Sequence, residues 1–85
     1  MHEIEIGHVS AFFARPQVAG IDLTGTMAVG DQVRIKGHTT NLWFTVDSME
    51  QNNVKVTDAP AGQSVGVKLP DRARAGDRVY KLIGE

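Results

Sequence analysis

Short runs of alternating apolar and polar residues constrain the fold of this chain more than any other feature. Ile21 and Leu23 flank Asp22, and Val33 and Ile35 alternate with polar or charged neighbours. An apolar residue at every second position gives a β-strand one core-facing side and one solvent-facing side. No window of about a dozen residues has apolar residues at the three-and-four spacing of an amphipathic helix. The pattern therefore predicts an all-β fold.

Turn residues divide the chain into six or seven such runs. Met49 falls one position out of phase with the run before it, and this slip predicts a β-bulge near Asp47 and Ser48. Short strands between regularly spaced turns are typical of sandwiches and barrels, and closing a barrel removes two exposed sheet edges. We predict one domain over residues 1–85, a small closed barrel of six or seven strands. The predicted strands cover residues 3–13, 18–23, 32–36, 42–46, 54–56, 65–69 and 78–83.

The charge balance excludes binding of nucleic acid by a strong overall positive charge. Lys and Arg total 9 and Asp and Glu total 10, a formal net charge of −1. A protein that binds nucleic acid mainly by neutralising phosphates usually has a clear basic excess. Any contact with nucleic acid must therefore depend on a local patch.

The ends of the sequence and its apolar runs favour a cytoplasmic protein. The segment Met1–Gly7 has acidic residues where a secretory signal has positive charge, and no apolar run approaches the length of about 20 residues that spans a bilayer. There is no cysteine, which is compatible with a reducing compartment. We expect no association with a membrane.

No residue pattern indicates catalysis or a bound cofactor. His2, His8 and His38 lack the spacing that brings metal ligands together, and the absence of cysteine excludes a thiolate zinc site. Neither a nucleophile elbow nor a phosphate-binding loop is present. We expect a protein that is not an enzyme, with no cofactor, no metal and no nucleotide bound by this chain alone.

Four segments with glycine-containing turns carry a resemblance to a known family. They cover residues 25–37, 45–50, 59–69 and 75–80. In order and spacing they resemble the β-barrel second domain of translational GTPases such as elongation factor Tu. The resemblance implies a translation-factor barrel separated from its nucleotide-binding domain.

The resemblance also gives residue-level expectations for binding. Glu50 falls where that family has an acidic residue beside the terminal adenosine of aminoacylated transfer RNA. Asn53 replaces a family arginine, and residues 14–17 replace a glycine-rich loop, so binding of the aminoacyl end is doubtful. The segment Gly37–Thr40 also resembles the barrel at the end of some collagenase-like peptidase family proteins linked to RNA modification.

Two groups of basic residues are candidates for contact with phosphates. Arg34 and Lys36 share the outer face of one predicted strand, with His38 just beyond it. Arg72 and Arg74 belong to a second basic cluster, whose positive charge is partly offset by Asp71 and Asp77. An ordinary solvated strand face is the simpler explanation of the alternating charges.

Aromatic residues give a further candidate surface. Alternation points Trp43 away from Leu42 and Phe44, so its ring either stacks on a partner or covers a barrel end. Phe12 and Phe13 are adjacent, so one of them faces outward near Arg15. We predict a binding module that docks on RNA or a ribonucleoprotein. The alternative is a protein-interaction module that docks, through Trp43 and Phe13, on a separate GTPase-like or RNA-modifying protein.

Overall fold

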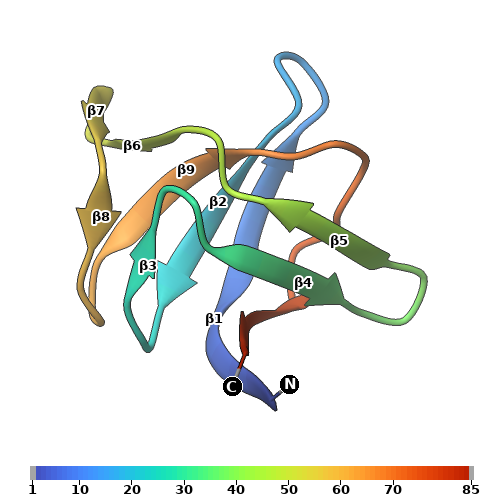
Figure 1. The fold of residues 1–85 in the computed structure, drawn as a ribbon. Helices are drawn as coiled ribbons and strands as arrows, with labels where there is room; N and C mark the ends of the chain where they lie inside the picture. The colour runs from blue at the N-terminus through green and yellow to red at the C-terminus, as the bar shows by residue number, and fades with distance from the viewer. Residues whose placement is uncertain (1, 85) are drawn as a thin grey trace.

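Two antiparallel sheets contain all the strands of residues 2–84, the part of the chain that the computed structural model describes (Figure 1). No helix occurs in these residues, so the all-β prediction is confirmed, and no helix that could cross a bilayer is found among them. The strands are β1 (His2–Phe13), β2 (Val18–Leu23), β3 (Met27–Ala28), β4 (Gln32–Lys36), β5 (Asn41–Thr45), β6 (Met49–Gln51), β7 (Val54–Val56), β8 (Asp58–Ala59), β9 (Ser64–Lys68) and β10 (Arg78–Ile83).

The larger sheet has eight strands in the order β5-β4-β10-β1-β2-β9-β6-β7, and the smaller one pairs β3 with β8. The last strand, β10, therefore lies inside the large sheet, between β4 and β1. Figure 1 shows this sheet coiling so that β4 and β5 lie in front of β1, β2 and β9. Its outer strands β5 and β7 do not pair with each other, so among the described residues the predicted closure of the barrel is not found.

Ten strands are present where the sequence predicts six or seven. The additional ones are β3, β6 and β8, which contain only two or three residues each. β3 and β8 pair through Met27 with Ala59 and Ala28 with Asp58. A segment this short has no alternation to detect, so a pattern analysis overlooks it.

The core follows the predicted alternation in the central strands. Val33 and Ile35 of β4 are fully buried, as are Ile21 of β2 and Val79 of β10. Ile4 differs from the prediction, because it is 48% exposed. It pairs with Lys81 near the free ends of β1 and β10, beyond the fully buried part of the sheet.

Irregular pairing in β1 replaces the bulge predicted near Asp47 and Ser48. The register of β1 shifts between Glu5 and Gly7 against β10, and again between Val9 and Ala11 against β2. The predicted bulge is wrong, because β5 ends at Thr45 and Met49 begins a new strand. The change of phase is therefore a break between two strands.

Candidate functional site

The structure does not bring the seven predicted site residues together. It places them in three regions of the surface. These are the outer face of β4 and β5 (Arg34, Lys36, Trp43), the β4–β5 turn with the loop before β10 (His38, Arg72, Arg74), and β6 (Glu50).

On the outer face, Arg34 is held by partners from its own chain. Its Nη1 donates to Glu3 at 3.0 Å and its Nε donates to Asn41 Oδ1 at 3.1 Å. Its guanidinium carbon lies 4.4 Å from the centre of the Trp43 ring, which is within range of a cation–π contact. Because its Nε and Nη1 donate to Asn41 and Glu3 and its charge is paired with Glu3, Arg34 is less available to a phosphate than an unpaired arginine.

Trp43 points outward, as the alternation predicts, and is 53% exposed. It lies directly opposite Arg34 in the pairing of β4 with β5. Its ring supports the guanidinium rather than covering an end of the sheet.

The second region surrounds a polar hollow of about 400 Å³, here called the basic hollow. Arg72 and Arg74 line it from the loop before β10, and Thr39 and Thr40 line it from the β4–β5 turn. Lys36 does not line the hollow. Its cross-strand partner Asn41 does. His38 is exposed within the same turn.

The Asp77 carboxylate packs against Gly37 and so joins the two walls of the basic hollow. The Gly37 amide donates to the Thr40 carbonyl at 2.9 Å and closes the turn. In the loop, the Asp77 carboxylate accepts from the Arg74 amide at 2.9 Å and packs directly against Gly37. A side chain at position 37 would overlap that carboxylate, so glycine allows the two walls to meet.

The cations of the basic hollow have no acidic partner among the described residues. Lys36, Arg72 and Arg74 make no side-chain ion pair there. Asp71 is the exposed carboxylate in the lining, and its Oδ1 accepts from the Arg72 amide. Two cations therefore line the hollow with one exposed carboxylate, and Lys36 adds a third cation beside it, a local positive excess that is not apparent from the net charge.

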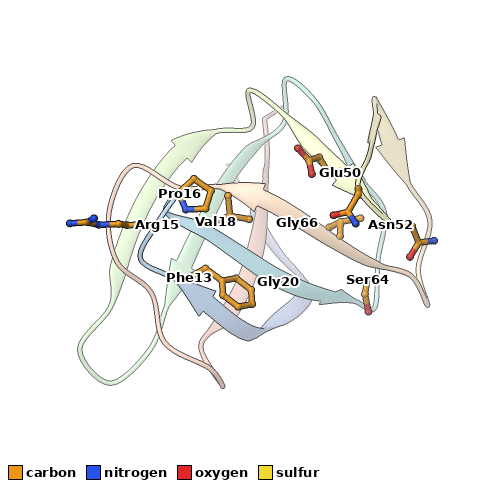
Figure 2. Close-up of a pocket in the computed structure, with 11 residues that line it drawn as sticks. Phe13, Arg15, Pro16, Val18, Gly20, Glu50, Asn52, Ser64 and Gly66 are labelled. Atoms are coloured by element: carbon orange, nitrogen blue, oxygen red, sulfur yellow. The ribbon is translucent and has the colours of Figure 1, made fainter.

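The third region is an open, mainly apolar groove of about 570 Å³, here called the outer groove (Figure 2). Figure 2 shows Glu50 and Asn52 toward one end of it and Arg15 and Pro16 at the other, and Asn53 also belongs to the lining. The remaining lining residues are Phe13, Val18, Gly20, Ser64, Val65 and Gly66.

Local sequence explains the shape of the outer groove. Gly20 and Gly66 lie opposite each other in β2 and β9, so the floor has no side chain at its centre. Asn52 and Asn53 join Gln51 to Val54 in a two-residue turn with φ of 53° and 64°. Asparagine tolerates this left-handed conformation better than most residues, and two such residues in succession suit a tight hairpin.

The sequence analysis named Phe13 and Glu50 as binding candidates but did not predict the groove that they line. Phe13 is 57% exposed and lines the groove with Arg15, while Phe12 packs against the core; the sequence predicted that one of the two faces outward, without deciding which. The missed signal was a glycine on the outer face of two separate strands, because a strand glycine often marks close approach by another chain or a ligand.

No candidate metal site is found among residues 2–84. No group of three His, Asp or Glu side chains converges there. His8 meets Asp22 at 3.4 Å on an exposed face, a contact of only two groups.

The fold and these three regions define a small all-β domain whose distinctive groups lie on its outer surface. No protein family profile matches the chain. An uncharacterized protease of Methanocaldococcus jannaschii is 43% identical over 81 residues, which is 94% of this chain. The chain spans only 20% of that relative's length.

Solved structures with the same fold come from the C-terminal domain of a putative U32 peptidase of Geobacillus thermoleovorans. Two crystal structures of that domain, one a selenomethionine variant, superpose with TM-scores of 0.87 and 0.86. Both matches cover 92% of this chain, and they cover 99% and 91% of the solved chains. Sequence identity is 16% in each case, so the similarity establishes the fold.

These comparisons correct the resemblance to the second domain of elongation factor Tu, which is wrong. The similar structures are a C-terminal domain of a peptidase family protein. The second resemblance, to the barrel at the end of collagenase-like peptidase family proteins, agrees with this finding. The error has a physical cause. The motifs that carried the resemblance are turns that contain glycine, and such turns reflect a local backbone conformation that unrelated β-sheets share.

Proposed function

We propose that this domain is a non-enzymatic binding module that docks on RNA or a ribonucleoprotein through the basic hollow. One observation carries the proposal, namely that Arg72 and Arg74 line a polar hollow without an ion-pair partner among the described residues, with Lys36 at the neighbouring end of β4. Unpaired cations at a concave surface can exchange bound counterions for phosphates.

The groups of the basic hollow suit a phosphate backbone. Arginine presents a planar fork of donors that matches two phosphate oxygens, and the exposed Thr39 hydroxyl adds a donor beside it. Lys36 supplies a further positive charge at the end of β4. These groups recognise the backbone and carry no base specificity.

Arg34 and Trp43 take a smaller part in this proposal than the sequence analysis gave them. Arg34 is already bonded to Glu3 and Asn41, and it covers one face of Trp43. The cations without partners are the better phosphate ligands.

The comparisons are consistent with an accessory role. The relative named a protease is about five times longer than the matched region, and the similar structures are a C-terminal domain. We place catalysis, where such a relative has any, outside the part that this chain matches. We also propose a cytoplasmic setting, in which RNA is available as a partner.

The test measures binding of fluorescein-labelled bulk transfer RNA, and of a labelled 20-nucleotide oligouridine, by fluorescence anisotropy between 50 and 300 mM KCl. Three phosphate contacts give a slope of about −2 to −3 in log K against log salt. Arg72→Ala and Arg74→Ala should each make the slope shallower by about 0.7 to 0.9.

Lys55→Ala is the matched control, because it removes from β7 one cation without an ion pair among the described residues. β7 is the edge strand opposite β5 in the large sheet. The control should keep the wild-type slope. Absence of binding, a flat salt dependence, or an equal effect of Lys55→Ala would refute the proposal. A protein partner that is retained in a pull-down after ribonuclease treatment would favour protein docking instead.

A further inference from the structure

The outer groove is a second surface, and the proposed docking on RNA makes no use of it. None of its lining residues lines the basic hollow. It combines the larger volume, about 570 Å³, with an exposed aromatic ring at Phe13. A mostly apolar concave surface with a few polar groups is the usual form of a ligand site.

Opposite charges stand at the two ends of the outer groove (Figure 2). Arg15 extends from the β1–β2 hairpin, and Glu50 rises from β6. Neither makes an ion pair or a side-chain hydrogen bond among residues 2–84. In contrast, Arg34 and Arg78 are each bonded to a glutamate of β1. The groove lining therefore has one cation and one anion, neither of them in an ion pair among these residues, and Lys55 lies opposite Glu50 in the pairing of β6 with β7.

The floor of the outer groove suits an extended chain. Gly66 pairs with Gly20 on one side and with Glu50 on the other, so a smooth path crosses β2, β9 and β6. Phe13 and Val18 pair directly and form an apolar wall beside this path. An apolar side chain can pack against that wall while its backbone lies over the glycines.

We propose that the outer groove binds an extended peptide segment of a partner protein, in which an apolar residue is flanked by an acidic residue on one side and a basic residue on the other. The acidic residue pairs with Arg15 and the basic residue pairs with Glu50. Charge complementarity decides against RNA as the occupant, because a strand of uniform negative charge meets one cation and is repelled by the Glu50 carboxylate.

The test uses three acetylated and amidated heptapeptides that differ only in charge. The mixed peptide is Gly-Asp-Ala-Leu-Ala-Lys-Gly, the diacidic one has Asp at both charged positions, and the dibasic one has Lys at both. Each is titrated into ¹⁵N-labelled protein. The mixed peptide should bind most tightly and shift the amide signals of Gly20, Gly66 and Phe13. These comparisons hold whichever direction the peptide runs.

Charge variants of the protein supply the decisive comparison. Arg15→Glu makes both ends acidic, so the dibasic peptide should become the preferred ligand. Glu50→Arg makes both ends basic, so the diacidic peptide should become preferred. Exposed pairs are weak, and the change in preference should be roughly 2- to 25-fold when both ends are counted.

A groove-filling variant checks the location of binding. At Gly66 a new Cβ would lie 3.5 Å from Val18 Cγ1 and 4.0 Å from the Glu50 carbonyl oxygen, which are ordinary contacts. Gly66→Ala should therefore fold, and Gly66→Val, which adds two methyl groups above that Cβ, should weaken binding of the mixed peptide roughly fivefold or more. Phe13→Ser, at an exposed position, provides the same test if Gly66→Val does not fold.

Several outcomes would overturn the proposal. These are signals that shift only outside the groove, peptide preferences that ignore the two charge variants, and binding that neither Gly66→Val nor Phe13→Ser weakens. Shifts of the groove signals by oligouridine in the absence of any peptide effect would assign the surface to RNA. Failure of RNA to bind the basic hollow leaves this proposal intact, because the two readouts come from different residues.

Discussion

Replacing Gly7 with alanine should destabilise the domain more than its single methyl group suggests. Gly7 is buried in β1, where the register against β10 shifts, and it pairs with Leu23 of β2. A Cβ at this position would overlap the carbonyl oxygen of Asp22 and lie 3.2 Å from the Leu23 Cα. The obstructing atoms belong to the backbone, so no side-chain rotation relieves the overlap.

The expected magnitude follows from this geometry. Forcing an extra methyl group into a tightly packed site costs about 1 to 3 kcal/mol. For a domain of this size each kcal/mol lowers the unfolding temperature by about 4 to 8 °C. Gly7→Ala should therefore lower it by roughly 4 to 24 °C.

Gly66→Ala is the matched control, since the same methyl group would meet only ordinary contacts at 3.5 Å or more. Glycine within a strand is about 0.5 to 1 kcal/mol less favourable than alanine, so this variant should be unchanged or slightly more stable. Urea denaturation followed by far-ultraviolet circular dichroism gives both free energies of unfolding. Equal stability of Gly7→Ala and Gly66→Ala would refute the close strand approach at Gly7.

Two other variants test the packing of the core and the outer face. Ile35→Ala should lower the free energy of unfolding by about 2 to 5 kcal/mol, because the side chain is fully buried, and calorimetry measures the loss. A loss below 1 kcal/mol would contradict its place in the core. Arg34→Ala should change stability by less than about 1 kcal/mol but increase acrylamide quenching of Trp43, the only tryptophan, because it uncovers one face of the ring. Unchanged quenching would contradict the stacking of Arg34 on Trp43.

The alternation of apolar residues predicted the parts of the fold in which a strand is long enough to have two faces. Val33 and Ile35 show this, since each is buried and their charged neighbours are not. The pairing of β3 with β8 was not predictable in this way, because each strand contributes only two residues. Closure of the barrel was inferred from the need to avoid exposed edges, and that argument does not determine which strands pair.

The sequence analysis selected candidate residues by type, and the structure shows an arrangement that the sequence did not predict. Arg34 has the right chemistry for a phosphate, but its charge is neutralised by Glu3. Glu3 is 31 positions away in the sequence and lies on β1, on the far side of β10 from β4. No local pattern reveals such a contact. Arg72 and Arg74 have no such partner among the described residues, which only the three-dimensional arrangement shows.

The position of β10 inside the large sheet affects the order in which the domain can form. Without β10 the chain can make the β4–β5 hairpin and, separately, the ladder from β1 through β2, β9 and β6 to β7. The last strand joins these two halves, and contacts this distant in sequence are typical of domains that fold in roughly milliseconds to seconds. The outer groove is made entirely by strands and turns of the second half. The basic hollow takes one wall from the β4–β5 turn and the other from the loop that leads into β10. We therefore expect the outer groove to be able to form during synthesis before the last strand has left the ribosome, and the basic hollow only afterwards.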